Sequence, residues 1–476
     1  MKISKVESKD LDSIYFIEKE CFDEPWPKEE FCLEVDNKDS EFIKLTDDNS
    51  DIVGYYLVWI SLDDADIGSI AIKKDNQGKG YGEYLFKNLL DRCIDKDVKK
   101  IHLEVNEKNI KARNLYEKFG FEKTRIRKGY YKDADGIEMV KGLLMSKKIL
   151  AIESSCDETA AAIIDEKLNI LSSVVTSQID VHARFGGVIP EIASRMHVEQ
   201  ISIIVEEAIK QAGVTMDDID AIAYTIGPGL IGSLHVGGIA AKTLAFFYNK
   251  PLIGVHHLKG HIFINELIKP LNYPVMALVV SGGHSELVYM ENDDSFKIIG
   301  TTLDDAVGES YDKVARVIGL EYPGGPKIDK LSKEGKKNYI LPTPKVDGYN
   351  FSFSGLKNAT LQLVNKMNMK GEEINKADLA YAFQETALNL LVNKTCKALE
   401  EYKDVKTVVV AGGVAANSRL RELMLEKIQG PEVILPPLKY CTDNATMIGV
   451  AAWHYYKHNK YVFLDAESKP NMSIED

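Results

Sequence analysis

The chain has 476 residues, of which 45% are hydrophobic and 28% are charged, and its formal net charge is −13 at pH 7. This composition is typical of globular proteins, and the length allows two or three domains, each with its own core. A membrane-spanning protein is excluded because no apolar run reaches the roughly 18 residues of a span. A basic nucleic-acid-binding module is also excluded, because both halves carry an acidic excess.

The N-terminal sequence MKISKVESKD is too charged for a secretory signal peptide. Six cysteines are scattered along the chain without a Cys-x-x-Cys pair, at Cys21, Cys32, Cys93, Cys156, Cys396 and Cys441. This usage fits a reducing compartment better than disulfides or a thiolate zinc site. We therefore expect a cytoplasmic protein.

The chain changes character near residue 146. Before it, short strand patterns at 51–60 and 67–72 alternate with amphipathic helix patterns at 82–94 and 111–120. After it, longer βαβ segments with glycine-rich turns begin. Met145 is either an initiator methionine kept at the junction of two reading frames or an ordinary core residue. We expect two α/β domains, 1–146 and 147–476.

A glycine-rich turn follows the strand that ends with Ile70, Ala71 and Ile72. The first turn of the next helix is predicted at Gln77, Gly78, Lys79, Gly80, Tyr81 and Gly82. Glycines let backbone N–H groups approach a ligand, and a helix N-terminus favours anions, so this turn suits a pyrophosphate. The order Gln-x-x-Gly-x-Gly is not that of dinucleotide sites. A plain strand-to-helix connection is the alternative.

Two further segments, CFDEPWPKEEF (21–31) and LEVNEKNIKARNLYEKFGF (103–121), complete a recognisable pattern. The set resembles the GNAT acetyltransferases, and within them the RimI branch, which acetylates the N-terminal amine of a ribosomal protein. The resemblance implies a GNAT fold and acetyl-CoA bound by the strand 70–72, the turn 77–82 and Asn109. A small amine or a partner subunit is the alternative acceptor.

The same resemblance assigns the two chemical roles of acetyl transfer. It implies Glu104 as the base that takes a proton from the acceptor amine through water, and Tyr116 as the acid that protonates the departing CoA thiolate. From the residues alone, Glu104 reads equally as an exposed strand residue and Tyr116 as a core aromatic.

The second half contains three loops of related design. ILAIESSCDETAAAIID (149–165) is a buried strand, a polar turn and a return strand, and ALVVSGGHSELVYM (277–290) repeats it. VVVAGGVAANSRLRELM (408–424) has the strand, Gly-Gly turn and helix expected of an adenosine site. Such loops are typical of the actin and Hsp70 ATPases. Together they predict a nucleotide cleft between two lobes, roughly 147–270 and 271–476.

Between the first two loops, GVHHLKGHIF (254–263) places His257 and His261 four residues apart. This spacing puts both imidazoles on one face of a helix, the usual way a helix offers two ligands to a metal. A metallopeptidase would have Glu as its base where Leu258 stands. The pair therefore predicts a metal with another role, and a peptidase is the rival interpretation.

All these segments together, with LDDAVGESYDKVAR, YPGGPKIDKL and YCTDNATMIG, resemble the TsaD family over about residues 148–460. The resemblance implies a two-lobed actin/Hsp70-like (ASKHA) fold. It implies transfer of a threonylcarbamoyl group from threonylcarbamoyl-AMP to N6 of the adenosine at position 37, 3′ of the anticodon, in tRNAs that read ANN codons. An actin-like ATPase or kinase is the alternative, although it has no use for the histidine pair.

The resemblance also implies a ligand set and a substrate site. One Fe²⁺ or Zn²⁺ per chain is bound by His257, His261 and Asp443 as a Lewis acid. Asp157 and Glu158 lie beside the metal and orient or deprotonate the attacking amine. The substrate is held by backbone amides of the second loop, at Val279, Val280, Ser281, Gly282 and Gly283. The nucleotide is contacted by four more residues, Asp312, Gly325, Asp329 and Asn417.

The partners implied by the resemblance are tRNA, a non-catalytic paralogue of the TsaB type and a P-loop ATPase of the TsaE type, with no membrane. An acidic protein binds tRNA through local basic residues. Four such residues are expected to border the second cleft: Arg195, Lys357, Arg419 and Arg421. A solvated surface residue or a structural ion pair is the alternative for each of them. The whole chain is thus predicted to be a bifunctional acyltransferase.

Overall fold

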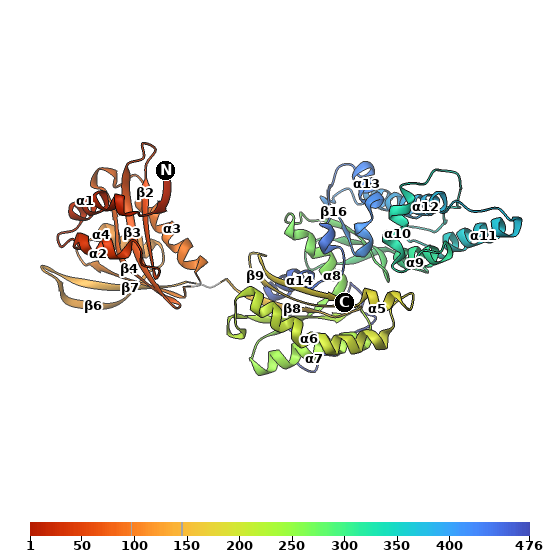
Figure 1. Ribbon diagram of the computed structural model, residues 1–476, viewed down its shortest axis with the longest axis horizontal. Coiled ribbons are helices and arrows are strands. Elements are labelled where there is room, and N and C mark those ends of the chain that lie inside the picture. Colours follow the sequence, from red (N-terminus) through yellow and green to blue (C-terminus); the bar gives the residue numbers. More distant parts are fainter. Residues whose placement is uncertain (97, 144–145) are drawn as a thin grey trace. The chain divides into compact units, whose positions relative to one another are not determined.

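The computed structural model describes residues 1–96, 98–143 and 146–476. The chain divides into two compact units, Met1–Ser146 and Lys147–Asp476 (Figure 1), and each is described by itself. Met145 lies outside the described residues. Among the described residues, no helix combines the length and the apolar character needed to cross a membrane.

The first unit is one seven-stranded sheet with helices on both faces. The strand order is β1-β2-β3-β4-β5-β7-β6. One core lies between the sheet and α3, and a second lies under α1 and α2. The elements are β1 (Lys2–Lys5), α1 (Leu11–Cys21), α2 (Lys28–Glu34), β2 (Ser40–Thr46), β3 (Ile52–Ser61), β4 (Asp64–Ile72), α3 (Tyr81–Asp95), β5 (Lys100–Asn106), α4 (Ile110–Lys118), β6 (Glu122–Tyr131) and β7 (Ala134–Gly142). The strands and helices expected from the sequence patterns are confirmed.

Strands β4 and β5 separate halfway along their length. They pair in parallel only over Asp64–Ile67 and Lys100–Leu103, although both continue further. Opposite β3, the ladder shifts register so that Gly68 is an extra residue on β4, and a Cβ there would lie 2.6 Å from the Trp59 ring. A bulge of this kind bends the strand that carries it. The result is an opening between β4 and β5 next to the glycine-rich turn.

The second unit contains two five-stranded sheets, ordered β10-β9-β8-β11-β12 and β15-β14-β13-β16-β17. The strands are β8 (Lys148–Glu153), β9 (Glu158–Asp165), β10 (Ile170–Ser177), β11 (Ala221–Gly227), β12 (Leu252–His256), β13 (Val275–Val280), β14 (Ser285–Met290), β15 (Lys297–Thr301), β16 (Thr407–Ala411) and β17 (Glu432–Ile434). Each sheet pairs a hairpin with parallel strands. The three loops are therefore confirmed as strand–turn–strand or strand–turn–helix units.

Helices cover the outer faces of these sheets, and others lie in the core between them (Figure 1). They are α5 (Ile179–Ala183), α6 (Pro190–Ala212), α7 (Ile231–Phe247), α8 (His257–Phe263), α9 (Val307–Val317), α10 (Gly324–Ser332), α11 (Ser354–Lys370), α12 (Lys376–Glu401), α13 (Ser418–Lys427) and α14 (Ala445–Lys457). Helix α14 packs on β8, β9 and α8. The end of the chain thus returns to the first sheet after building the second.

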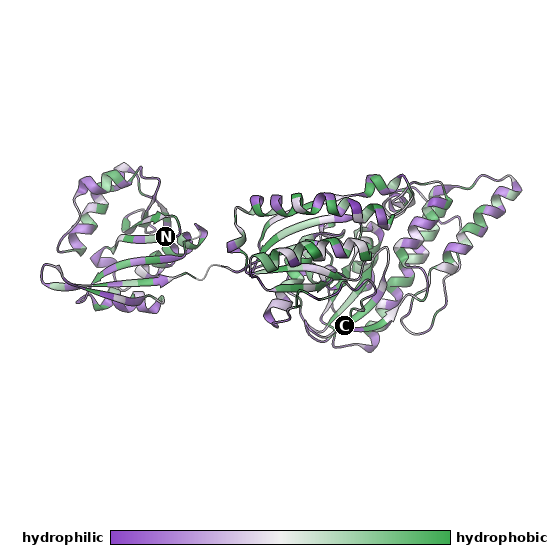
Figure 2. Ribbon diagram, turned by 90° about the horizontal axis from the view of Figure 1, so that it is seen from below, coloured by the Kyte–Doolittle hydropathy of each residue, from purple (hydrophilic) through white to green (hydrophobic). Residues whose placement is uncertain are grey.

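The strand residues alternate between two cores. In β8, Leu150 and Ile152 face α6 and α7, whereas Ile149 and Ala151 enter a core shared with α8, α14 and the second sheet. Because both faces are buried, the strands are apolar along their whole length, which is visible as green strands in Figure 2. The shared core joins the two lobes, and α8 lies within it.

Candidate functional site

Helix α8 carries the two predicted histidine ligands. It begins directly after β12, and His256 caps it by accepting the Leu258 N–H at 3.1 Å. The Nε2 atoms of His257 and His261 lie 3.5 and 3.1 Å from Oδ1 of Asp443. One ligand atom from each residue falls within 4.8 Å of the others, and both histidines are buried. The structure therefore brings the three predicted ligands together.

A buried carboxylate fixes the orientation of His257. Glu153, at the end of β8, is 0% exposed, and its Oε2 lies 3.2 Å from His257 Nδ1. The same carboxylate accepts hydrogen bonds from the Thr225 hydroxyl at 2.6 Å and from the Ser155 N–H at 2.5 Å. When His257 donates its Nδ1 proton to Glu153, its Nε2 lone pair points toward Asp443. This is the usual carboxylate support of a metal-binding histidine.

The charges of the cluster suit a cation. Burial alone would lower the pKa of His257, but the carboxylates of Asp443 and Glu153 outweigh burial and raise it to about 9. Burial would raise the pKa of Asp443, but the two imidazoles lower it to about 2. Nδ1 of His261 is buried without a hydrogen-bond partner among the described residues. Two imidazoles and an ionised carboxylate fit a divalent metal.

The second glycine-rich loop lies next to this cluster. Val279 and Val280 end β13 as buried residues, whereas Gly282 and Gly283 are exposed, with open space where a side chain would be. The Ser281 N–H closes the loop by donating to the main-chain carbonyl oxygen of His284 at 2.8 Å. Burial and the charges of His257 and His261 lower the pKa of His284 to about 4. The loop and the metal cluster therefore share one electrostatic environment.

The predicted nucleotide contacts form a second group. Asp312, on α9, accepts the Gly324 N–H at 2.7 Å, at the N-terminus of the helix that carries Gly325 and Asp329. Asp329 accepts the Ser418 hydroxyl at 3.0 Å. Asn417 caps α13 and donates to Gln384 at 2.8 Å, and Gln384 also contacts Asp329. The four predicted residues thus come together through hydrogen bonds and adjacent helix ends.

Gly412 brings the adenosine-type loop against the second loop. Its φ is 91°, and a Cβ at this position would lie 2.4 Å from the Val280 carbonyl oxygen. Only glycine tolerates both conditions. This contact joins the predicted substrate loop (279–283) to the turn that leads to Asn417.

In the first unit, the glycine-rich turn precedes the helix. Helix α3 begins at Tyr81, so the expectation that Gln77 to Gly80 form its first turn is wrong. Gly78 and Gly80 have φ values of 74° and 85°, which end any helix that includes them. Gln77 instead donates its side-chain N–H to the Ile72 carbonyl at 3.0 Å. The turn still presents the N-terminus of α3 beside the end of β4.

The two predicted catalytic residues of the first unit differ in environment. Glu104, on β5, forms an ion pair with Arg127 of β6, and the guanidinium lies 4.3 Å from the centre of the Tyr130 ring. Tyr116 is 8% exposed and packs on Phe86, and burial raises its pKa well above the ordinary value. Its phenol therefore keeps its proton. Asn109 caps α4 by accepting the Ala112 N–H at 3.2 Å.

Comparison with known proteins separates the two units. The family described as "TsaD: tRNA N6-adenosine threonylcarbamoyltransferase" matches residues 169–450, and the acetyltransferase (GNAT) family matches residues 11–121. The tRNA N6-adenosine threonylcarbamoyltransferase of Halalkalibacterium halodurans is 52% identical over 332 residues, covering 69% of this chain and 96% of the relative. The chain belongs to this family.

A TsaD relative from Bacillus subtilis is 52% identical over 331 residues, covering 68% of this chain and 95% of the relative. Among solved structures, the ribosomal-protein-S18-alanine N-acetyltransferase of Escherichia coli is 30% identical, with a TM-score of 0.29, and covers 30% of this chain and 95% of that chain. The second unit is thus a TsaD domain of the ASKHA type, and the first is a GNAT acetyltransferase domain. The protein is an acyltransferase, as predicted.

In the TsaD unit, Asp157 ends the loop between β8 and β9, and Glu158 is the first residue of β9. Asp157 is buried, and Glu158 accepts the Ser177 hydroxyl at 3.1 Å. Burial, followed by the charges of Asp443 and Asp157, raises the pKa of Glu158 to about 10. Without a cation nearby, Glu158 therefore carries a proton at neutral pH.

Three of the four basic residues expected to bind tRNA have intramolecular partners. Lys357 pairs with Asp305 at 2.5 Å, and Arg419 pairs with Glu385 at 2.6 Å and with two further glutamates. Arg421 donates to the carbonyls of Ala415 and Pro436. Arg195, on α6, is exposed. The partners fit the alternative that these three side chains form structural contacts.

Sequence reasoning missed Glu153, His284 and Gln384. Glu153 could have been found from the sequence, because it ends the apolar run ILAIE. An ionisable residue in that position is buried when the run forms a central strand. His284 left one as well, since it directly follows the glycines of the second loop. Gln384 lies within a long amphipathic helix, α12, where nothing local distinguishes it from other polar residues.

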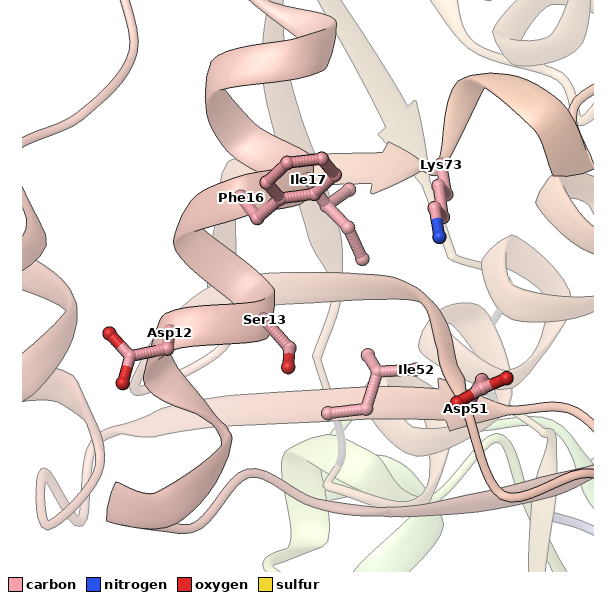
Figure 3. Close-up of a pocket in the computed structure, with 7 residues that line it drawn as sticks. All are labelled: Asp12, Ser13, Phe16, Ile17, Asp51, Ile52 and Lys73. Atoms are coloured by element: carbon pink, nitrogen blue, oxygen red, sulfur yellow. The ribbon is translucent and has the colours of Figure 1, made fainter.

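The first unit also has a surface hollow (Figure 3). It is lined by α1 residues, the start of β3 and the residue after β4, namely Asp12, Ser13, Phe16, Ile17, Asp51, Ile52 and Lys73. None of the predicted acetyl-CoA or catalytic residues is among them. We assign it no role in acyl transfer.

Proposed function

We propose that the TsaD unit transfers the threonylcarbamoyl group of threonylcarbamoyl-AMP to N6 of adenosine 37 in tRNAs that read ANN codons. The observation that carries this proposal is the convergence of His257, His261 and Asp443 beside the glycine-rich loop that ends β13. A metallopeptidase of the His-Glu-x-x-His type would have its base at the position of Leu258, which is apolar.

We propose Fe²⁺ or Zn²⁺ as the ion held by His257, His261 and Asp443. Bound there, it would supply Lewis-acid polarisation of an acyl-phosphate oxygen of the donor. Glu153 keeps the Nε2 lone pair of His257 available by holding the Nδ1 proton. His284 remains neutral in this environment and adds no competing positive charge.

The adenylate part of the donor would lie against the second loop and the α9–α10 corner. Exposed backbone at Gly282 and Gly283 can approach phosphate oxygens closely, because no side chain intervenes. Asp312, Asp329 and Asn417 offer acceptors and a donor for ribose and adenine groups. In this proposal the carbamoyl carbon would lie between the loop and the metal cluster.

The reaction forms a bond from N6 to the carbamoyl carbon, breaks the bond from that carbon to the phosphate oxygen, and releases AMP and one proton. Asp157 and Glu158 are the candidate groups for orienting N6 and accepting that proton. A cation at Asp443 would favour the ionised form of Glu158, since opposite charges nearby stabilise a carboxylate. Glu158 would therefore act as a base only in the metal-loaded protein.

Transfer to position 37 requires the target adenine to leave its stack. Arg195 is our candidate for a phosphate contact, because Lys357, Arg419 and Arg421 already have partners. Replacing Arg195 by Ala should therefore weaken tRNA binding and reduce its salt dependence, and Arg419→Ala should act mainly on stability. Unchanged tRNA affinity in Arg195→Ala would place the docking surface elsewhere.

We propose that a TsaB-type paralogue covers the outer helices of the first lobe and that a TsaE-type ATPase completes the system. Helices α6 and α7 pack together and expose large apolar side chains on their outer surface. The most exposed are Val198, Ile203, Ile239, Phe246 and Phe247. An apolar surface of this extent is unusual on an isolated subunit and fits a helix-rich partner.

For the GNAT unit, we propose acetyl transfer from acetyl-CoA to the N-terminal amine of a ribosomal protein. The opening between β4 and β5 offers unpaired strand backbone to the cofactor chain, and the N-terminus of α3 offers N–H groups to its pyrophosphate. Glu104 would accept the amine proton and Tyr116 would protonate the thiolate, consistent with its raised pKa.

The decisive experiment is nucleoside mass spectrometry of tRNA from cells depleted of the protein and complemented with variants. His261→Ala and Asp443→Ala should abolish threonylcarbamoyladenosine and lower the metal content of the purified protein, while leaving acetylation unchanged. Exposed His458, the residue that follows α14, supplies the matched control, His458→Ala. One metal per chain in both ligand variants would refute the ligand set.

A further inference from the structure

The described residues beyond α14, 458–476, form no helix or strand, yet they make specific contacts along the first lobe. Within residues 462–476, the Val462 N–H bonds to the Leu252 carbonyl of the edge strand β12 at 2.9 Å. The Lys469 N–H bonds to the Ile226 carbonyl at 2.8 Å. A Cβ on Gly227 would lie 2.0 Å from the Lys469 carbonyl oxygen, so this glycine lets the two backbones meet. The 462–476 segment is therefore a fitted part of the lobe.

The last residues of this segment reach the helix that carries the metal ligands. Nε2 of His256, the residue before the first ligand, lies 3.3 Å from the Met472 carbonyl oxygen. Since His256 Nδ1 accepts the Leu258 N–H, Nε2 carries the proton and donates to Met472. Lys259, between the two ligands, donates to the Asp476 carbonyl oxygen at 3.2 Å. Both anchors are buried.

The same residues reach the second lobe. The carboxylate of Glu475 accepts the Ile298 N–H of β15, the edge strand of the second sheet, at 2.8 Å. Ile474 is 1% exposed and lies in the core shared by α8, α14 and both sheets. The ring of Phe296, which precedes β15, packs at 4.3 Å under the Lys259 ammonium. Residues 472–476 thus connect α8 to an edge of the other lobe.

We propose that the 462–476 segment positions α8 for metal binding, with His256 and Lys259 as positioning residues held by Met472 and Asp476. The inference rests on the proposed metal at His257, His261 and Asp443. The two anchors bracket the first ligand, so losing them frees the N-terminal half of α8 to rotate. Because Glu475 attaches the same segment to β15, a change in the angle between the lobes would act on the ligand helix.

The test is the rate at which the purified full-length protein releases Zn²⁺ to a chromogenic chelator. We compare the wild type with a chain ending at Pro470 and with Lys259→Met, which keeps the apolar stem but cannot donate to Asp476. Lys457→Met changes an exposed lysine at the end of α14 and is the matched control. Each lost hydrogen bond to a charged or buried group should speed release about tenfold.

Faster release in both variants, with the control unchanged and Lys259→Arg closer to the wild type, supports the proposal. Melting temperatures distinguish this from general loosening, because Lys259→Met should release metal faster at temperatures well below its transition. Wild-type release rates in Lys259→Met and in the shortened chain overturn the inference. If the wild-type chain binds no metal at all, the proposed metal site itself fails, and that outcome is seen before any variant is compared.

Discussion

Replacing Glu153 by Gln tests whether one buried carboxylate sets the state of the metal site. Glu153 is 0% exposed and takes three donors, from His257, Thr225 and Ser155. Glutamine keeps the shape but has only one acceptor oxygen, so its NH₂ must face one of these donors. If the NH₂ faces His257 Nδ1, the ring accepts there and carries its proton on Nε2. The lone pair that should bind the metal is then lost.

The expected effect follows from this exchange of tautomers. Replacing a carboxylate that supports a ligating histidine typically weakens metal binding by about 10–100-fold, or roughly 1.4–2.7 kcal/mol. If the NH₂ instead faces Ser155 N–H, two donors oppose each other in a buried site. This opposition would destabilise the loop that leads to Asp157 and lower the free energy of unfolding by about 1–3 kcal/mol.

The assay is competition for Zn²⁺ between the protein and a chelator of known affinity, together with a urea unfolding curve. Glu266→Gln is the matched control, because Glu266 follows α8 directly but bonds to His454 instead of a metal ligand. We expect metal affinity to fall in Glu153→Gln and to stay within twofold in the control. Equal affinity in Glu153→Gln and the wild type would refute the assigned role.

Glu104→Gln should lower the acetylation rate by about 10²–10⁴-fold with little change in acetyl-CoA affinity, measured with an Ala-starting peptide; a full rate at neutral pH would remove Glu104 as the base. Gly412→Ala should lower the free energy of unfolding by at least about 1–3 kcal/mol, because φ is 91° and the Cβ meets Val280, whereas Gly413→Ala has open space and should be mild. Burial alone would lower the pKa of His454, but the carboxylates of Glu266 and Asp293 outweigh burial and raise it. The protonated ring therefore stabilises the folded state fully below about pH 6.5, the pKa of an unfolded histidine, and this stabilisation is lost as pH rises through the folded pKa. The melting-temperature advantage of the wild type over His454→Gln should therefore shrink as pH rises above about 6.5, and a constant difference would contradict the assignment.

Much of the fold follows from local patterns in the sequence. Apolar runs such as ILAIE and ALVV form central strands because both of their faces are buried, and the glycines that follow them mark the loops. The four-residue spacing of His257 and His261 needs only a helix to place both rings on one face. These features depend on period and turn chemistry, which neighbouring residues determine.

The boundary of α3 shows where a local reading fails. Sequence alone placed Gln77 in the first turn of that helix, but the positive φ values of Gly78 and Gly80 move the start to Tyr81. The glycines that identify the turn are also the residues that delay the helix. Tyr116 is a related case, since its burial against Phe86 fits a core aromatic and is also compatible with the proposed role as an acid.

The charged part of the site was decided by tertiary structure. Asp443 meets His261 across 182 positions of the chain, and Glu153 meets His257 across 104. Lys357 and Arg419, which the sequence offers as tRNA contacts, instead pair with Asp305 and Glu385. A charged side chain has the same local signature whether it is solvated, paired or poised for a ligand. Its role depends on which distant segment folds against it, and that is fixed only when the two lobes and the end of the chain pack around α8.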